Sequence, residues 1–168
     1  LIVPASCGNT AARVRTEPSG PAGGRRLSDQ YPELLEIEGL CQLSRAIEDM
    51  RGPGSGQFEG IARFNADGAG LAYAEEGRLT LAGQAPVTAT RRYLWRPGGD
   101  GGISVLFEDG RPFHRIWPGR LMPDDTHVCT PDLYHVAYDF RGWPAWSATW
   151  RVVGPRKDYR MVSRYRRG

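Results

Sequence analysis

Residues 132–165 read DLYHVAYDFRGWPAWSATWRVVGPRKDYRMVSRY and contain three runs in which apolar and polar residues alternate. Successive side chains of a β-strand point to opposite faces, so this alternation predicts three strands, each with one buried face. The faces that we expect in the core are Tyr134, Val136, Tyr138 and Phe140 in the first run, and Trp146, Ala148, Trp150 and Val152 in the second.

The same period of two extends back to Gln57. The segments between the runs are short and rich in Gly, Pro and Asp, so they form turns rather than the helical crossovers that parallel strands need. We predict strands over residues 57–64, 70–77, 78–82, 87–96, 102–108, 112–117, 126–129, 133–140, 145–153 and 158–165. A sheet of about ten twisted strands tends to close on itself. The predicted fold class is mainly β, with an antiparallel up-and-down barrel as first choice and a two-sheet sandwich as second.

A different period precedes the predicted strands. Apolar residues at helical spacing are Leu40, Leu43, Ile47 and Met50. This spacing predicts one short N-terminal helix over residues 39–50, which RGPGSG ends. Residues 1–35 form a low-complexity segment with too little apolar surface to fold alone, and we predict an extended arm there. The predicted organisation is therefore an arm over 1–35 and a helix plus β-barrel domain over 36–168.

Composition limits the class of protein. The chain has 168 residues, of which 40% are hydrophobic and 24% charged, as expected of one globular domain. The sequence lacks an apolar run of the roughly 20 residues that a membrane-spanning helix needs, so no transmembrane segment is predicted. The three cysteines, Cys7, Cys41 and Cys129, include no CxxC pair that would indicate a zinc knuckle.

Several blocks of the sequence carry a resemblance. GLAYAEEG, RRYLW, VLFEDGRPFH, HVCTPDLYHVAYDF and WRVVGPRKDYRMVSRY resemble successive blocks of a family of small, mostly bacterial domains of unknown function. The similarity covers roughly residues 38–166 and implies a lipocalin-like (calycin-like) barrel, but it implies no activity. Haem-binding barrels of similar architecture carry a histidine in their C-terminal strands. This chain has none after His135, and we expect no cofactor.

His127, Cys129 and His135 are the residues nearest to a metal or catalytic pattern. A His/Cys/His cluster can bind zinc, but the spacing H-x-C-x5-H matches no standard zinc pattern. Cys129 as a nucleophile, with His127 or His114 as base and Asp132 to orient it, is a formal alternative, but the sequence has no nucleophile elbow or phosphate-binding loop. An enzyme is our third choice, and neither a metal site nor a catalytic residue is predicted.

Charge and the arm point to a partner instead. Eight basic residues and one acidic residue lie between Arg141 and Gly168. The first functional hypothesis is a non-catalytic accessory subunit of a larger multi-protein complex, docked through its N-terminal arm. The chain does not start with Met, and its first residues are rich in Arg and Ala, which predicts an organelle, plastid or mitochondrion. The residues predicted to contact partner subunits are Arg13, Arg15, Arg25, Arg26, Arg166 and Arg167.

The alternative hypothesis is a lipocalin-like carrier of a small apolar ligand. The residues predicted to contact that ligand are His114, His127, Tyr134 and Arg156. A barrel filled with bulky aromatic side chains would favour the accessory subunit, and a cavity lined by small residues would favour the carrier. Nucleic-acid binding is not favoured, because Tyr159 and Tyr165 share one strand face with Met161 and are expected in the core.

Overall fold

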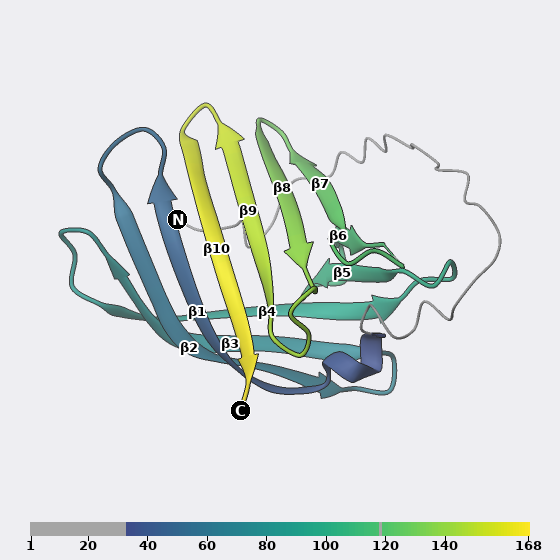
Figure 1. Ribbon diagram of the computed structural model, residues 1–168. Coiled ribbons are helices and arrows are strands. Elements are labelled where there is room, and N and C mark those ends of the chain that lie inside the picture. The colour runs from purple at the N-terminus through teal and green to yellow at the C-terminus, as the bar shows by residue number, and fades with distance from the viewer. Residues whose placement is uncertain (1–32, 118) are drawn as a thin grey trace.

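A computed structural model describes residues 33–117 and 119–168. Its ten antiparallel strands form one sheet that curls into a nearly closed barrel (Figure 1), which confirms the predicted mainly β fold. The strands are β1 (Gly39–Asp49), β2 (Ser55–Ala66), β3 (Leu71–Leu81), β4 (Val87–Pro97), β5 (Ile103–Phe107), β6 (Pro112–Ile116), β7 (Asp124–Cys129), β8 (Asp132–Asp139), β9 (Trp146–Gly154) and β10 (Lys157–Arg167). In the described part of the chain, no helix is long and apolar enough to cross a membrane.

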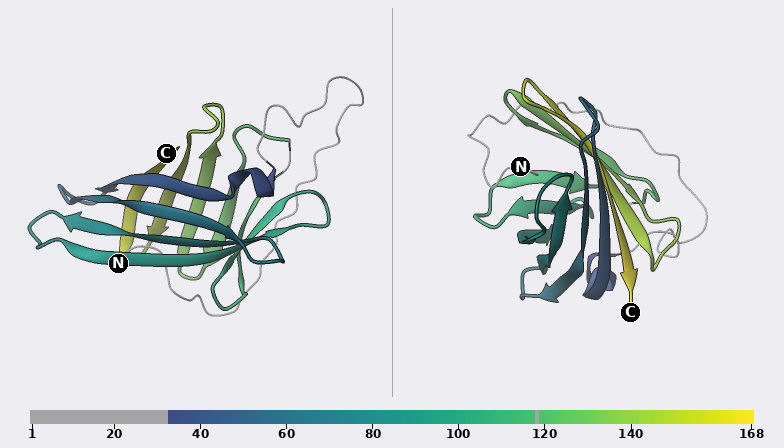
Figure 2. Two further views of the ribbon diagram at one scale, coloured as in Figure 1. Left: turned by 90° about the horizontal axis from the view of Figure 1, so that it is seen from below. Right: turned by 90° about the vertical axis from the view of Figure 1, so that its left-hand side faces the viewer.

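The strand order is that of an up-and-down meander. Strands that follow one another in the chain are neighbours in the sheet from β1 to β6 and from β7 to β10. The first and last strands also pair, with Arg45 of β1 opposite Ser163 of β10. Figure 2 shows the curled sheet from two further sides, and β6 and β7 lie next to each other where Figure 1 labels them. One sheet therefore provides the whole wall around a single interior.

The predicted helix over residues 39–50 is wrong, because this segment is strand β1. Its buried residues are Cys41, Leu43, Arg45 and Ile47, which alternate with exposed or half-buried ones. Leu40 and Met50, which completed the helical pattern, are 48% and 53% exposed. The charged side chain at an inward position hid the period of two. In place of a helix, the 3-10 turn η2 (Leu34–Ile37) precedes β1.

Strand β3 is one continuous element where two strands were predicted, over residues 70–77 and 78–82. Gly77, the last residue of the first predicted strand, pairs directly with Gly60 of β2 and continues the ladder. The number of strands nevertheless agrees with the prediction, since β1 replaces the strand lost by this fusion.

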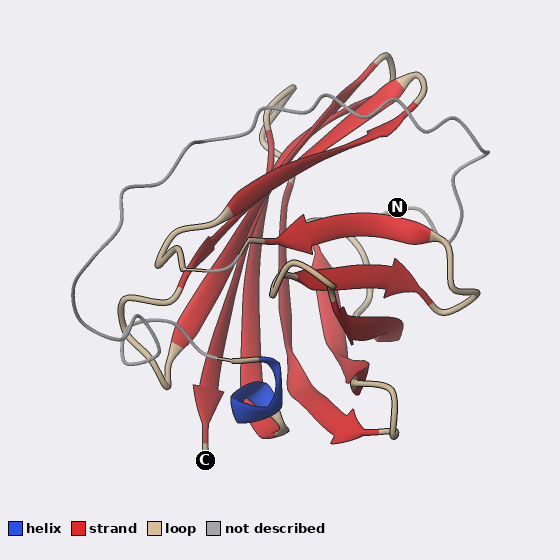
Figure 3. Cartoon of the chain, turned by 90° about the vertical axis from the view of Figure 1, so that its right-hand side faces the viewer, coloured by secondary structure: helices blue, strands red, loops and turns tan. Residues whose placement is uncertain are grey.

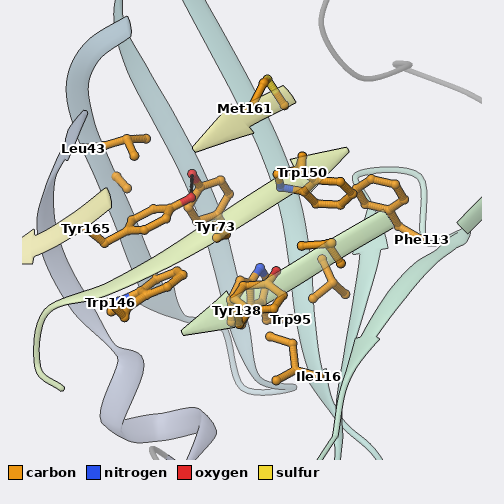
Figure 4. Close-up of a cluster of buried hydrophobic side chains, with 14 of the residues drawn as sticks. Leu43, Tyr73, Trp95, Phe113, Ile116, Tyr138, Trp146, Trp150, Met161 and Tyr165 are labelled. Atoms are coloured by element: carbon orange, nitrogen blue, oxygen red, sulfur yellow. Dashed lines mark hydrogen bonds between the residues drawn. The ribbon is translucent and has the colours of Figure 1, made fainter. Parts of the chain in front are cut away.

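The barrel interior is filled largely by aromatic side chains (Figure 4). The predicted inner faces of β8 and β9 are buried as expected. Trp146 stacks on Tyr165 with ring centroids 3.7 Å apart, and Phe113 stacks on Trp150 at 5.1 Å. Stacked and edge-on ring pairs of this kind add to the stabilisation that burial itself provides.

Strands β6 and β7 meet without a backbone ladder, and side chains close the seam between them. The amide of Arg115 donates a hydrogen bond of 2.6 Å to the carboxylate of Asp125. The ring of His127 makes a second hydrogen bond, to the backbone of Phe113. Both bonds join a side chain of β7 to the backbone of β6, so the barrel closes at this seam more weakly than elsewhere.

The turn η2 lies at the end of the barrel where β1 begins and β10 ends (Figure 3). Ile37 is buried in the core, and Arg167 donates hydrogen bonds to the carbonyl oxygens of Glu36 and Glu38. The arm was predicted over residues 1–35. Residues 1–32 lie outside the described part of the chain, and residues 34 and 35 are the first two residues of η2.

Candidate ligand-binding cavity

Strand β4 is longer than its neighbour β5, and the difference leaves an opening in the barrel wall. The pairing with β5 covers residues 93–97 of β4, while residues 87–92 pair with β3 on their other side. Of the strands that the structure describes, none pairs with the free side of residues 87–92. A cavity of about 720 Å³ lies at this opening.

The cavity reaches from the interior to the outer face of the sheet. Its apolar inner wall comes from five consecutive strands and consists of Ile47, Phe58, Leu79, Leu81, Ala89 and Phe107. The inward-facing polar side chains at its floor are Arg45, Glu75, Arg91 and Tyr93. Ile47 lies near the end of β1 and η2 precedes its start, so the cavity and η2 lie at opposite ends of that strand.

A buried ion pair between Arg45 and Glu75 forms the floor. Nη1 and Nη2 of Arg45 each donate a hydrogen bond of 2.7 Å to one carboxylate oxygen of Glu75, and its Nε donates one of 2.7 Å to Oγ of Ser163. The hydroxyl of Tyr73 donates to Glu75 and lies 3.3 Å from the hydroxyl oxygen of Tyr165. Ser163 and Tyr73 therefore hydrogen-bond to a pair of opposite charges whose side chains are only 5% and 3% exposed.

Arg91 adds a second guanidinium group. It lies opposite Glu75 in the β3–β4 register, and its Nε is 3.7 Å from Oε1 of Glu75, beyond hydrogen-bonding distance. Burial opposes the charge of Glu75, but the hydrogen bonds from Arg45 and the charges of both arginines outweigh it and lower the pKa of Glu75. Burial raises the pKa of Tyr93 to about 12, so its hydroxyl stays protonated at neutral pH and can donate a hydrogen bond.

A pair of glycines explains how the floor fits. Gly60 and Gly77 face each other across β2 and β3. A Cβ on Gly77 would lie 2.3 Å from the carbonyl oxygen of Glu59 and 2.6 Å from Cζ of Phe58. The Phe58 ring therefore occupies the space that a side chain would need, and the Arg45 guanidinium lies over it, 5.1 Å from the ring centroid.

The four residues predicted to contact a ligand lie elsewhere in the barrel. His114 is buried on β6, with Nε2 2.7 Å from the hydroxyl oxygen of Tyr138. His127 is half-buried on β7, Tyr134 is buried on β8, and Arg156 is exposed in the turn between β9 and β10. None of the four belongs to the lining of the cavity beside β4. Whether any of them contacts a ligand stays a prediction.

The structure does not bring His127, Cys129 and His135 together. His127 lies opposite Tyr134 and Cys129 opposite Asp132 in the β7–β8 register, whereas His135 faces the outer side and bonds to Thr126. The described residues contain no group of three or more His, Cys, Asp or Glu side chains placed to hold a metal ion. Asp132, the residue considered for orienting the histidine, accepts a hydrogen bond of 2.6 Å from Lys157.

The predicted partner-binding arginines divide into two groups. Arg13, Arg15, Arg25 and Arg26 lie outside the described residues. Arg166 and Arg167 are exposed at the end of β10. Arg167 also lies over the ring of Trp143 at 5.1 Å, in addition to its bonds to the η2 segment, so it helps to hold that end of the barrel.

The sequence analysis did not identify the charged floor, although its residues occupy positions that alternation assigns to the inward face of each strand. Arg45 follows Leu43 by two positions, Glu75 follows Tyr73, and Arg91 precedes Tyr93. Charged residues in register with aromatic ones on neighbouring strands are the signal that could have found them.

The model of a family of unknown function, DUF6314, matches residues 37–167, which include every strand of the barrel. Searches of curated proteins and of solved structures gave no significant match.

Proposed function

We propose that this chain, which belongs to the DUF6314 family of unknown function, binds a small molecule in the cavity beside β4. The proposal takes no activity from the family. In this proposal the barrel acts in the manner of a lipocalin, as a non-catalytic carrier or sensor. The ligand enters through the wall next to residues 87–92 instead of along the barrel axis.

The cavity is the single observation that carries the proposal. Its volume of about 720 Å³ falls in the usual range for sites that bind small molecules. Apolar side chains form its inner wall, and charged and polar side chains line its floor and its mouth, so the cavity can contact both apolar and polar parts of a ligand. Aromatic side chains fill much of the remaining described interior, so this end of the barrel is the place where a ligand fits.

Binding of the neutral fluorescent probe N-phenylnaphthylamine tests the proposal. Ala89 points into the cavity, and Ala89→Trp would occupy part of its volume. The neighbouring Thr88 is exposed on the other face of β4, so Thr88→Trp is the matched control. We expect the first variant to weaken probe binding at least tenfold, worth about 1.4 kcal/mol, and the second to leave it unchanged. Equal binding by wild type and both variants would exclude this cavity as the site.

The second candidate is the accessory subunit of a larger complex, docked through the N-terminal arm and located in a plastid or mitochondrion. The largely filled aromatic interior favours it, because a docking module needs no internal cavity. Its test is the native mass of the endogenous protein in a gentle extract, with a chain lacking residues 1–30 as comparison. A monomeric mass for the endogenous protein would refute this candidate.

A further inference from the structure

The part of β4 that extends past β5 has an unpaired backbone edge (Figure 1). Gly98 donates a backbone hydrogen bond to Gly102 across the β4–β5 hairpin. In an antiparallel ladder, every second residue directs both its N–H and its C=O to the same neighbour. Even-numbered residues of β4 therefore face the side of β5, and beyond the end of β5 this series continues with Thr90 and Thr88. Among the described residues, no backbone group pairs with these two on that side.

This edge has the features of a strand that can accept another strand. The β3–β4 register is continuous along it, so no bulge turns the edge away. Residues 87–92 contain no proline, and the two threonines that face the free side are exposed and β-branched. The free stretch ends at Arg92, whose guanidinium lies 3.2 Å from the carboxylate of Glu108 in the turn after β5. Residues 87–91 are thus open to pairing.

The cavity lies beside the free edge and supplies space for side chains. Side chains that lie opposite one another in a ladder point to the same face of the sheet. A residue paired with Ala89 therefore points into the cavity, as Ala89 itself does. Ala89 ends a row of small inward-facing residues that continues through Gly77 and Gly60, and its methyl group leaves room for a larger neighbour. A residue paired with Val87 extends the apolar row that Val87 forms with Leu79.

We propose that residues 87–91 of β4 bind an extended peptide segment of a partner protein, which adds to the sheet as an antiparallel strand. Backbone hydrogen bonds to Thr88 and Thr90 hold the segment, and apolar side chains opposite Val87 and Ala89 select it. The proposal goes beyond the proposed function. The added strand takes the place that β5 leaves vacant, and so it closes the opening through which a small molecule enters.

The chemistry of the edge favours a peptide over a second copy of this chain. In two copies paired antiparallel through a two-fold axis at Ala89, Arg91 of each copy would lie opposite Val87 of the other. That register places a cation beside the apolar wall to which Leu79 and Leu81 belong, where an apolar side chain is stabilised and a charge is not. The partner segment therefore alternates polar and apolar residues and carries no charge on its apolar face.

Synthetic peptides test the proposal. The probe is Lys-Val-Thr-Phe-Thr-Val-Lys with fluorescein at its N-terminus, and its binding is measured by fluorescence anisotropy. With its phenylalanine opposite Ala89, the N–H groups of its threonines face β4 and that of its phenylalanine faces away. We expect N-methylation of both threonines to weaken binding about tenfold or more, and N-methylation of the phenylalanine to change it less than about threefold. Absence of binding, or equal weakening by the two modifications, would overturn the proposal.

A variant tests the same edge from the side of the protein. Thr90→Pro removes an N–H that faces the free side, so the β3–β4 ladder keeps its hydrogen bonds. We expect this variant to bind the unmodified peptide about tenfold more weakly or less than that, with circular dichroism as the check on its fold. The comparison of N-methylated peptides uses wild type alone and does not depend on the folding of the variant.

The outcomes separate this proposal from the proposed function. If N-phenylnaphthylamine binds and the peptide does not, the cavity stands and the proposal about the edge is wrong. If the peptide binds and N-phenylnaphthylamine does not, only the proposed function fails. Light scattering gives the mass of wild type in solution, which we expect to be that of a monomer. A wild-type dimer that Thr90→Pro converts to a monomer would assign the edge to a second copy and overturn the assignment to a peptide.

Discussion

Acid should destabilise this barrel through His114. Burial, with a further contribution from the charge of His127, lowers the pKa of His114 to about 3. The usual value for an unfolded chain is about 6.5. A histidine whose pKa is depressed by folding binds its proton more readily in the unfolded chain, so stability is lost as pH falls below 6.5 and the loss levels off near pH 3. For these two values the loss between pH 7 and pH 5 is about 2 kcal/mol.

Urea denaturation at a series of pH values measures this loss. His114→Phe removes the titrating group and keeps an aromatic ring, so we expect its free energy of unfolding to fall by about 2 kcal/mol less than that of wild type between pH 7 and pH 5. Tyr138→Phe is the control, because it removes the hydrogen bond to Nε2 of His114 but leaves the imidazole buried. This variant should be less stable at every pH and keep the wild-type dependence. If His114→Phe and wild type show the same pH dependence, the reasoning is refuted.

Two further predictions concern the cavity floor. Arg45→Met should lower the free energy of unfolding by about 3–5 kcal/mol because it leaves the carboxylate of Glu75 buried without its main partner, and Arg45→Met combined with Glu75→Leu should recover most of the loss. Urea denaturation of the four members of this cycle gives the coupling, and additive losses would contradict it. Gly77→Ala should cost about 2 kcal/mol in the same assay, because its Cβ would overlap a backbone oxygen, whereas Gly52→Ala meets no atom within 4 Å and should be neutral. A neutral Gly77→Ala would show that the close approach is relaxed in solution.

Alternation of apolar residues predicted the strands well where every inward position is apolar or aromatic. Strands β8 and β9 are the best examples, since their inner faces are buried as the sequence indicates. Strand β1 failed for a physical reason. Its inward face includes Arg45, whose burial is tolerable because Glu75 and Ser163 receive its hydrogen bonds. These partners lie 30 and 118 positions away, and a local pattern does not contain them.

The cavity depends on information of the same long-range kind. Its opening exists because β4 continues past the end of β5, and the sequence showed the lengths of both strands only approximately. Its polar floor depends on residues of β1, β3 and β4 that only the sheet register brings together. The candidates for ligand contact that the sequence suggested were His114, His127, Tyr134 and Arg156, whereas the polar floor consists of Arg45, Glu75, Arg91 and Tyr93.

The pairing of β1 with β10 has a consequence for how the domain is made. These strands lie next to each other near the middle of the sheet, and the Arg45–Ser163 bond joins residues 118 positions apart. On the ribosome, β1 is complete long before its partner exists, so the central ladder can form only when synthesis of the domain is nearly finished. A chain that stopped before β10 would lose the link between two half-sheets and not just a strand at the edge. By contrast, a chain rearranged to begin and end between β6 and β7 would keep every ladder of the barrel.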